Sequence, residues 1–420
     1  MDPITVAIVG CGSRGHDTYA QCQKRFPDRM KIVAAADIDA EKLERMRREF
    51  SLPDDMCFTS AEALLEQPRL ADILFICTPD DMHYTEAMAA LALDYHLLLE
   101  KPLARAPQEC RDIERLAIER HRHVVVCHVL RYTVFYQKLK ELIDNGTIGD
   151  VVNIQALEKV CYWHQAHSFV RGNWRCAEET NPMILAKSCH DMDILLWLAG
   201  KHCERVSSFG TLKHFRPDNA PEGAPARCTD GCPAAATCPY NAEAFYMGHV
   251  ANGMLDWPVN VLSPYPSEKT IRKAIEEGPY GRCVYHCDND VVDHQVVNLL
   301  LEDGVTVDFN MSAFTAHQGR NIRIMGSMGE LLGDMDANSI RVMRFGQPDE
   351  EIDVRTLTDD FSGHGGGDVR MVEDLLGLVA GEREITGALT NISDSVESHL
   401  VALAAEASRL QGGAAISMKD

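Results

Sequence analysis

The chain has few basic side chains relative to acidic ones and no long uninterrupted apolar run. Its 41 lysines and arginines stand against 63 aspartates and glutamates, which gives a formal net charge of −22 over 420 residues. Nucleic acids and anionic membranes are bound by basic patches, so this balance argues against both kinds of partner. A bilayer span needs about 20 consecutive apolar residues, and we find no such run in the sequence.

The N-terminal segment "MDPITVAIVG" also lacks a basic region and a long apolar region ahead of its first glycine. We therefore expect no signal peptide and a cytoplasmic protein. In that reducing compartment most of the 15 cysteines are expected to be free core residues. The 45% hydrophobic content is ample for a core, and the length predicts two or three domains.

The first third of the sequence has the pattern of a dinucleotide-binding fold. A glycine-rich G-x-G-x-x-G loop separates an expected strand over 4–9 from an expected helix over 16–26. Such a loop permits a tight turn, lets a pyrophosphate approach the backbone and packs helix on strand. Asp37 ends the next apolar run, where a carboxylate accepts hydrogen bonds from a ribose diol, so the pattern predicts NAD(H) rather than NADP(H). The expected cofactor residues of the loop are Gly10, Gly12, Ser13, Arg14 and Gly15.

Alternating strands and helices continue to about residue 130 and predict a doubly wound parallel sheet. In such sheets ligands bind at the carboxyl ends of the strands. The candidate residues at these ends are Thr78, Pro79, His83, Glu100, Lys101, Pro102 and His128.

Five motifs make the chain resemble the glucose–fructose oxidoreductase/inositol dehydrogenase (Gfo/Idh/MocA) family. They are "TPDDMH" (78–83), "EKP" (100–102), "MDILLWLAG", "IRIMGSMGELLG" and "GHGGGD" (363–368). The resemblance implies an α/β protein with an N-terminal Rossmann domain over 1–130. A C-terminal α/β domain over 131–420, with a large and mostly antiparallel sheet, is expected to follow. It also implies a homo-oligomer, because the open face of that sheet commonly pairs subunits in the family.

The segment "ILAKSCHDMDILLWL" (184–198) is expected to form one helix with a polar first half. Lys187, His190 and Asp191 are spaced i, i+3, i+4 and would share a face. Three ionisable groups followed by an apolar continuation favour a helix that lines a cleft, although a core helix with a solvated end is the simpler alternative.

The resemblance assigns roles to some of these residues. In the family the lysine of "EKP", here Lys101, lies beside the nicotinamide and positions or protonates the substrate oxygen. The later helix carries an aspartate four residues before a histidine. Here the histidine is His190, but Ala186 occupies the aspartate position and Lys187 stands beside it. The expected catalytic set is therefore Lys101, Lys187 and His190, with His190 as general base.

A segment rich in aromatics and donors, "EKVCYWHQAHSFVRGNWR" (158–175), precedes this helix. Sugars stack on aromatic faces and arginines bind carboxylates in a bidentate manner, so we expect substrate contacts here. An ordinary strand and loop is the alternative. The candidate substrate residues are Tyr162, His164, Arg171, Trp174, Arg175 and Asp191.

An insert at about 215–290 contains five cysteines and few aliphatic residues. Such a segment lacks apolar area to order itself, which thiolate–metal bonds could supply. We therefore predict a structural zinc, or an iron–sulfur cluster, with Cys287 or His286 as substitute ligands and unliganded thiols as the alternative. The predicted ligands are Cys228, Cys232, Cys238 and Cys283.

Together these features predict an NAD-dependent oxidoreductase acting on a hydroxyl of a sugar, polyol or sugar acid. A second hypothesis is a glycoside hydrolase in which tightly bound NAD undergoes transient oxidation and reduction around an elimination step. A third is a non-catalytic NAD or redox sensor, against which Lys101 and His190 together argue.

Overall fold

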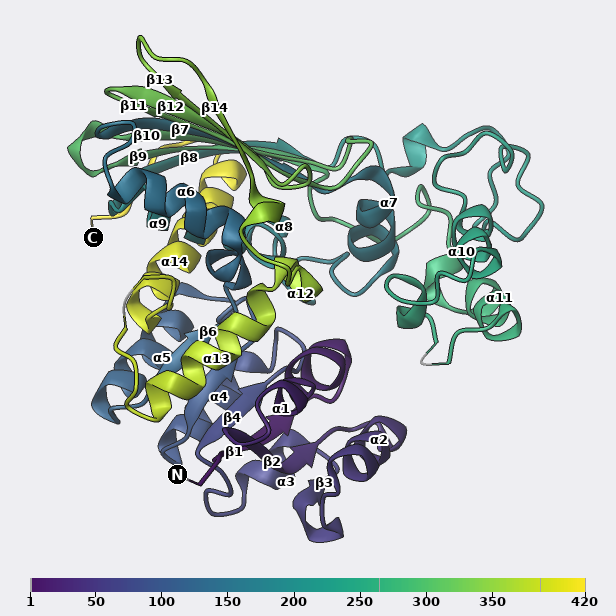
Figure 1. Cartoon of the computed structure of the whole chain (residues 1–420). Helices are drawn as coiled ribbons and strands as arrows, with labels where there is room; N and C mark the ends of the chain where they lie inside the picture. Colours follow the sequence, from purple (N-terminus) through teal and green to yellow (C-terminus); the bar gives the residue numbers. More distant parts are fainter. Residues whose placement is uncertain (1, 264, 386, 420) are drawn as a thin grey trace.

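The computed structural model describes residues 2–263, 265–385 and 387–419 and contains two sheets joined by shared helices (Figure 1). The first sheet has six strands in the order β3-β2-β1-β4-β5-β6 and all its pairs are parallel. The second has nine strands in the order β14-β13-β12-β11-β7-β10-β9-β8-β15, and only β7 and β10 pair in parallel. The predicted fold class is thereby confirmed.

The parallel sheet is covered on both faces, which is why its strands read as continuous apolar runs such as "ILFI" and "VVV". Its strands are β1 (Ile4–Val9), β2 (Met30–Ala36), β3 (Cys57–Phe58), β4 (Ile73–Ile76), β5 (His96–Leu99) and β6 (Val124–Val126). Its helices are α1 (Cys22–Arg25), α2 (Ala40–Phe50), α3 (Ala61–Leu65), α4 (His83–Ala92) and α5 (Pro107–Glu119). The strand order reverses between β1 and β4, the place where such sheets bind ligands.

The nine-stranded sheet has strands in which buried and exposed residues alternate, as expected when helices cover one face. Helices α6 (Val134–Asp144), α9 (Cys189–Ala199) and α14 (Ile392–Leu410) lie on that face (Figure 1). The strands are β7 (Val151–Lys159), β8 (Cys203–Thr211), β9 (His294–Leu301), β10 (Thr306–Ser312), β11 (Gly319–Gly326), β12 (Gly329–Asp334), β13 (Ser339–Arg344), β14 (Glu350–Asp353) and β15 (Ile416–Ser417).

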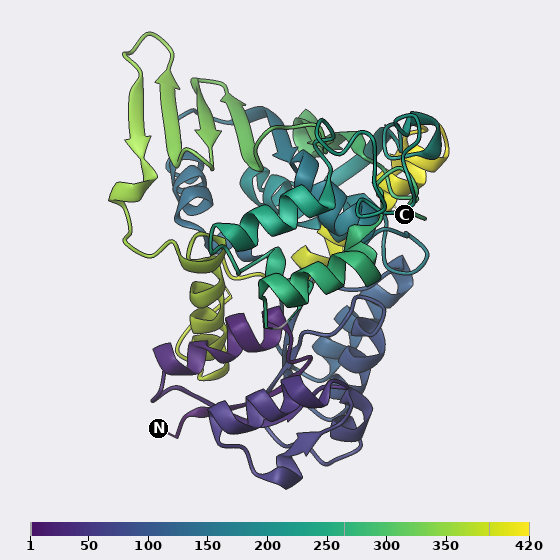
Figure 2. The same ribbon diagram turned by 90° about the vertical axis from the view of Figure 1, so that its right-hand side faces the viewer.

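The last helices return to the N-terminal domain. Met371 and Leu375 of α13 (Gly367–Val379) are buried in one cluster with Ile8 and Phe75 of the parallel sheet. Helix α14 contributes Val396 to a cluster of the same domain, while other residues of α14 belong to the core of the second domain. Residues from the chain's two ends thus share one core (Figure 2).

The insert projects from the side of the second domain next to α7 (Tyr162–His164) (Figure 1). It contains α10 (Ala242–Ala251) and α11 (Glu268–Glu277), whose buried side chains form a small core of their own. Two further short helices, α8 (Met183–Ala186) and α12 (Ser362–Gly365), lie between the two domains. None of the helices in the described ranges is long and apolar enough to span a membrane.

Candidate active site

The glycine-rich loop follows β1 at the switch point of the parallel sheet. Gly10 has φ +85°, and a Cβ there would lie 2.5 Å from the carbonyl oxygen of Cys77. A Cβ on Gly15 would lie 1.9 Å from the oxygen of Gly10, so helix and strand pack here as closely as backbone allows. At Gly12 a Cβ would meet no atom within 4 Å. The two outer glycines serve packing, and the middle one leaves open the space that a pyrophosphate needs.

Asp37 is fixed at the end of β2. Its Oδ2 accepts from the backbone N–H of Cys11 at 2.6 Å and its Oδ1 from that of Asp39 at 2.8 Å. The carboxylate lines a surface pocket together with Ile38 and Leu43. A rigid acid beside an apolar pocket suits an adenosine ribose, so the residues of this loop region fit NAD.

Arg14 connects the glycine-rich loop to the "EKP" motif and to α13. Its guanidinium donates to Glu100 at 2.5 Å and to Asp368 at 2.7 Å, and Tyr19 donates to the same oxygen of Glu100 at 2.7 Å. Burial acts to raise the pKa of Glu100, but the charge and hydrogen bond of Arg14 outweigh it and lower that pKa. Glu100 therefore remains ionised as the anchor of Arg14.

The "TPDDMH" and "EKP" segments are tied together by His83. Its Nδ1 lies 2.7 Å from the carbonyl oxygen of Pro102 and its Nε2 lies 3.0 Å from that of Thr78. Pro79 follows Thr78 in the loop after β4. Because His83 is buried and both ring nitrogens face carbonyls, we interpret it as a residue that fixes the two loops.

Lys101 reaches from the NAD-binding domain to the second domain. Its Nζ donates to the carbonyl oxygen of Ala186 at 2.8 Å. Ala186 ends α8, at the position where the resemblance led us to expect an aspartate. A backbone carbonyl therefore provides the acceptor for the ammonium here.

The expected single helix over 184–198 is broken. α8 ends at Ala186 and α9 begins at Cys189, so Lys187 and Ser188 lie in a turn between them. Lys187 makes an ion pair with Glu158 at 3.2 Å instead of extending the face that carries His190. The prediction of one continuous helical face was wrong.

A buried network of charges lies behind this turn. Arg320 on β11 pairs with Glu158, its cross-strand neighbour on β7, at 2.8 Å and with Asp191 at 2.7 Å. Burial is the largest influence on the pKa of Lys187 and lowers it, opposed by the charge of Glu158. Burial raises the pKa of Asp191, against the pull of Arg320. Two cations and two carboxylates thus balance one another inside the protein.

His190 is 8% exposed and lies among other histidines. Its ring centroid is 6.0 Å from that of His128 and 6.5 Å from that of His364, and its Nδ1 has no partner among the described residues. Burial, followed by the charge of Lys101, lowers the pKa of His190 well below its usual value. The imidazole is therefore neutral at pH 7 and able to accept a proton.

Asp193, the second aspartate of the segment, has a structural role. It is fully buried and accepts two hydrogen bonds from Arg131, at 2.7 and 2.6 Å. This pair anchors α9 to the segment after β6, which carries His128.

The predicted substrate residues fall into two groups. Burial, followed by the charge of Lys187, lowers the pKa of His164 well below its usual value. Its ring contacts Trp257 of the insert at a centroid distance of 4.9 Å. Tyr162 lies in the same helix α7, with its ring 6.1 Å from that of Tyr240.

Three other predicted residues contact protein groups. Arg171 is buried and donates to the backbone oxygens of Arg282 and Tyr240, both at 2.7 Å. Arg175 pairs with Asp288 at 2.9 Å. Trp174 packs against the core of the second domain. These contacts hold the base of the insert and bring none of the three residues to Lys101 or His190.

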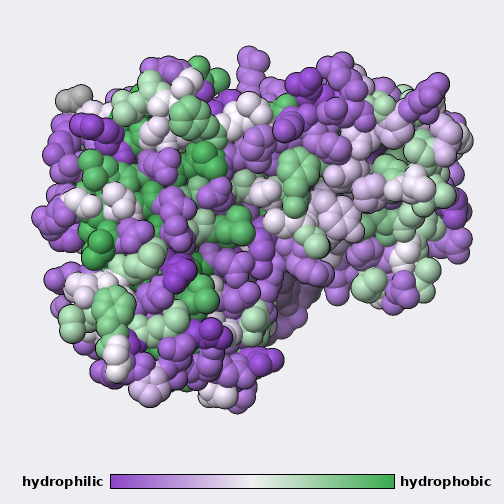
Figure 3. Space-filling view, turned by 90° about the horizontal axis from the view of Figure 1, so that it is seen from above, coloured by the Kyte–Doolittle hydropathy of each residue, from purple (hydrophilic) through white to green (hydrophobic). Residues whose placement is uncertain are grey.

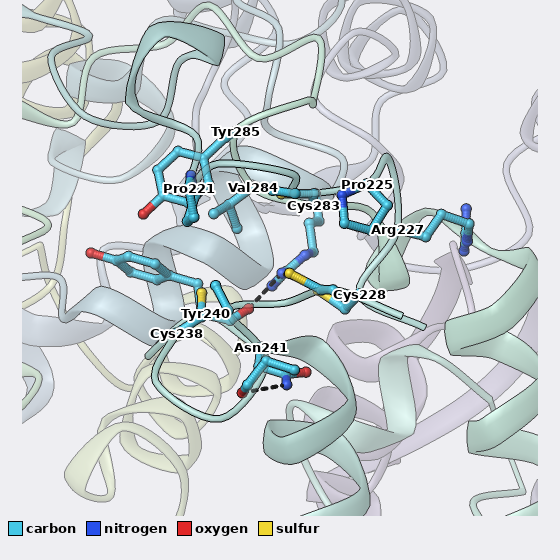
Figure 4. Close-up of a pocket in the computed structure, with 15 residues that line it drawn as sticks. Pro221, Pro225, Arg227, Cys228, Cys238, Tyr240, Asn241, Cys283, Val284 and Tyr285 are labelled. Atoms are coloured by element: carbon cyan, nitrogen blue, oxygen red, sulfur yellow. Dashed lines mark hydrogen bonds between the residues drawn. The ribbon is translucent and has the colours of Figure 1, made fainter. Parts of the chain in front are cut away.

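The predicted metal centre is not supported. Cys228, Cys232, Cys238 and Cys283 do line one small cavity (Figure 4), and all are free thiols. Within the described ranges, however, no group of three or more His, Cys, Asp or Glu side chains is placed to hold a metal ion. Arg171 lines the same cavity and donates to the sulfur of Cys228 at 3.7 Å.

The insert is ordered instead by apolar clusters that include aromatic side chains, which a count of aliphatic residues alone does not predict. Phe215, Val284 and Tyr285 form a cluster with Ala166 and Val170. Tyr246, Ile271 and Ile275 form another between α10 and α11. Aromatic rings therefore supply the buried area that we expected from metal ligation.

Comparison with known proteins agrees with this arrangement. Residues 4–128 match the family model described as "Oxidoreductase family, NAD-binding Rossmann fold", and residues 140–413 match the model for the C-terminal alpha/beta domain of the same family. The chain belongs to the Gfo/Idh/MocA oxidoreductase family. The predicted membership is thereby confirmed, and with it an NAD-binding oxidoreductase fold.

Relatives of this Gfo/Idh/MocA protein are distant in sequence. A protein of Bacillus subtilis (strain 168) named as an oxidoreductase, YteT, is 23% identical over 392 residues, 88% of each chain. An inositol 2-dehydrogenase of Pseudomonas savastanoi pv. phaseolicola (strain 1448A / Race 6) is 28% identical over 198 residues. That match covers 46% of this chain and 54% of the relative, so the chain spans about half the length of the inositol dehydrogenases it matches.

Solved structures share the fold of this family member. An oxidoreductase domain protein from Kribbella flavida has a TM-score of 0.74 at 16% identity and full coverage of both chains. The WlbA dehydrogenase from Bordetella pertussis, solved with NADH and UDP-GlcNAcA, has a TM-score of 0.67 at 17% identity and covers 100% of this chain and 99% of its own.

Several residues near the site were missed by the sequence reasoning. Their types gave at most a weak signal: charged residues such as Glu158 and Asp368 are rarely buried without a partner or a role, but burial cannot be read from the sequence and His364 is exposed. Their positions gave none, because they come from β7, β11 and the "GHGGGD" segment and meet only in the folded chain. They are Glu158, Arg320, His364 and Asp368.

Proposed function

We propose that the protein is an NAD-dependent dehydrogenase that transfers hydride between a hydroxyl of a sugar, polyol or sugar acid and the nicotinamide. The observation that carries this proposal is the meeting of Lys101 and His190 from different domains. Lys101 is held on the carbonyl of Ala186, four residues before His190, and its charge helps keep His190 neutral. A neutral imidazole beside a fixed ammonium suits the removal of an alcohol proton.

Bound NAD would accept a hydride in the oxidation direction and return it in the reverse direction. His190 accepts the hydroxyl proton in this proposal, because burial and the charge of Lys101 keep its imidazole neutral and so leave one ring nitrogen free to accept it. Lys101 places its positive charge at the oxygen where negative charge develops.

The substrate class is supported by the surroundings of the site. Lys187 and Arg320 lie next to the site, but Glu158 and Asp191 already pair with them, so they contribute a polar wall for substrate hydroxyls rather than free positive charge. Trp257 of the insert is 42% exposed and contacts His164, so an aromatic face is available for a sugar ring. The relatives named as inositol dehydrogenases agree with a polyol or sugar.

The test is an assay of the purified protein with NAD⁺ and a panel of polyols, sugars, sugar acids and aryl glycosides. NADH absorbance and released aglycone are followed together. Net NADH, lost in Lys101→Met but retained in Lys138→Met, supports the proposal, because Lys138 lies on α6 away from the site and pairs with Glu141 of the same helix. Aglycone without net NADH would replace the proposal with the glycosidase reaction. Neither signal, with NAD⁺ still bound, would favour the sensor.

We also propose that the face of the nine-stranded sheet opposite the helices pairs two subunits. In the view from above, hydrophobic residues gather over this sheet (Figure 3). Val152, Phe209 and Leu332 are each at least 40% exposed on strands whose alternate residues are buried. Light scattering on a size-exclusion column tests this, with Phe209→Glu expected to yield monomer; a wild-type monomer would refute it.

A further inference from the structure

The "GHGGGD" segment places a second histidine at the site. Its glycines 363, 365 and 366 all have positive φ, between 54° and 79°, and this backbone turns His364 of α12 toward the start of the following helix α13. The Nδ1 of His364 lies 3.0 Å from Oδ2 of Asp368, and its backbone N–H donates to the same oxygen at 3.2 Å. The other oxygen of Asp368 accepts from Arg14 of the cofactor loop.

This pairing sets the tautomer of His364. A carboxylate at Nδ1 holds the proton there and leaves Nε2 as an acceptor. Burial acts to raise the pKa of Asp368, but His364 and Arg14 outweigh it and lower it strongly, so the carboxylate stays ionised. The side chain of His364 is 48% exposed, whereas that of Asp368 is 3% exposed. The carboxylate of Asp368 is therefore fixed inside the protein, while the imidazole of His364 that it holds reaches solvent.

His190 has two histidine neighbours, and only one leads outward. His128 is fully buried and its ring lies 5.3 Å from that of His399, whose two ring nitrogens contact the backbone at Ser395 and Leu103. A proton passed that way would remain inside the protein. The ring of His364, 6.5 Å from that of His190, is the neighbour whose side chain is exposed at the surface.

We propose that His364 relays the substrate proton from His190 to solvent. A direct N–H···N bond would bring two imidazole centroids to roughly 5 Å, so 6.5 Å matches a single bridging water. In the oxidation direction the hydroxyl O–H breaks and an N–H forms on His190. That proton then moves through the water to Nε2 of His364 and on to solvent, and reduction runs the same path backwards.

The charges around His364 suit this exchange. One oxygen of Asp368 holds Nδ1 of His364 while Arg14 pairs with the other oxygen, so the ring is oriented without depending on a solvent contact. His190 cannot keep the proton, because burial and Lys101 disfavour its charged form. The relay thus lets His190 return to its neutral state after each turnover.

This inference rests on the proposed dehydrogenase function, and His364→Gln tests it with the panel compound that gives the fastest NADH formation. We expect kcat to fall roughly 10-fold in weak buffer, with recovery in added imidazole and an unchanged Kd for NAD⁺. The matched control is His202→Gln, an exposed histidine paired with Glu397 at 2.7 Å away from the site. An unchanged kcat, a loss that imidazole does not reverse, or an equal loss of NAD⁺ affinity would overturn the relay.

A second measurement needs no substrate, so it separates the relay from the proposed function. Nitrogen-15 NMR of histidine-labelled, NAD⁺-loaded protein at pH 8 reads the tautomer of each imidazole, and His364→Gln assigns the signal. A proton on Nδ1 and a bare Nε2 support the relay. A proton on Nε2, or on both nitrogens, overturns it even if every panel compound is inactive.

Discussion

Glu158 holds two buried cations, and its replacement by glutamine should destabilise the second domain. The side chain is 2% exposed and pairs with Lys187 and Arg320, while Asp191 remains as the other carboxylate of the network. Removing one partner of a buried ion pair costs about 3–5 kcal/mol, because it leaves a charge without compensation. Since glutamine keeps the shape and one acceptor, we expect about 3 kcal/mol for Glu158→Gln.

Urea unfolding followed by tryptophan fluorescence measures this loss in the relevant domain, since all four tryptophans lie between residues 163 and 257. With an m-value of roughly 3 kcal/mol/M the midpoint should fall by about 1 M. The matched control is Glu351→Gln, which breaks the exposed pair with Arg341 across β13 and β14. That change should stay within about 0.5 kcal/mol.

The loss of stability caused by Glu158→Gln should also become smaller as the pH rises. The pKa of Lys187 is already lowered by burial, and loss of Glu158 lowers it further. A lysine with a lower pKa in the folded state favours unfolding while it is charged, and this penalty disappears as rising pH removes its proton. The deficit of Glu158→Gln should therefore be smaller at pH 9.5 than at pH 7. A deficit equal to that of Glu351→Gln, or constant with pH, would refute the reasoning.

Three further predictions concern other parts of the chain. Gly15→Ala should prevent stable folding, because the added Cβ would overlap the backbone of Gly10, whereas Gly12→Ala should fold normally and weaken NAD⁺ binding. Circular dichroism measures folding and calorimetry measures NAD⁺ binding, and equal behaviour of the two variants would contradict the packing argument. Burial lowers the pKa of both His167 and His399 to about 3. As the pH falls below 6.5, each histidine should therefore reduce the free energy of unfolding by about 1.4 kcal/mol per pH unit. An acid unfolding transition that begins only where carboxylates titrate would contradict this. Arg171→Met should loosen the insert, seen as faster proteolysis within 215–290, and unchanged proteolysis would show that its hydrogen bonds are dispensable.

Local patterns were sufficient to predict the N-terminal domain, because the glycine spacing, the apolar strands and the acid after β2 are all visible along the sequence. The large, mostly antiparallel sheet of the second domain was expected from the family resemblance.

The arrangement of the site depends on distant residues, and there the sequence reasoning was incomplete. The break at Lys187 reflects an ion pair with Glu158 on β7, which no helical period can show. The metal prediction considered aliphatic content alone and overlooked the aromatic clusters that order the insert. His364 escaped notice because its relation to His190 arises only when α13 returns to the parallel sheet.

That return of α13 has a consequence for synthesis on the ribosome. The first 130 residues contain every strand of the parallel sheet, but part of its buried surface is covered by Met371, Leu375 and their neighbours. At roughly 5–20 residues per second, the covering helices emerge about 12 to 50 seconds after the last strand. During that interval the nascent sheet exposes apolar surface, so the protein should be a client for chaperones that bind growing chains, and its NAD-binding site should mature only when the chain is nearly finished.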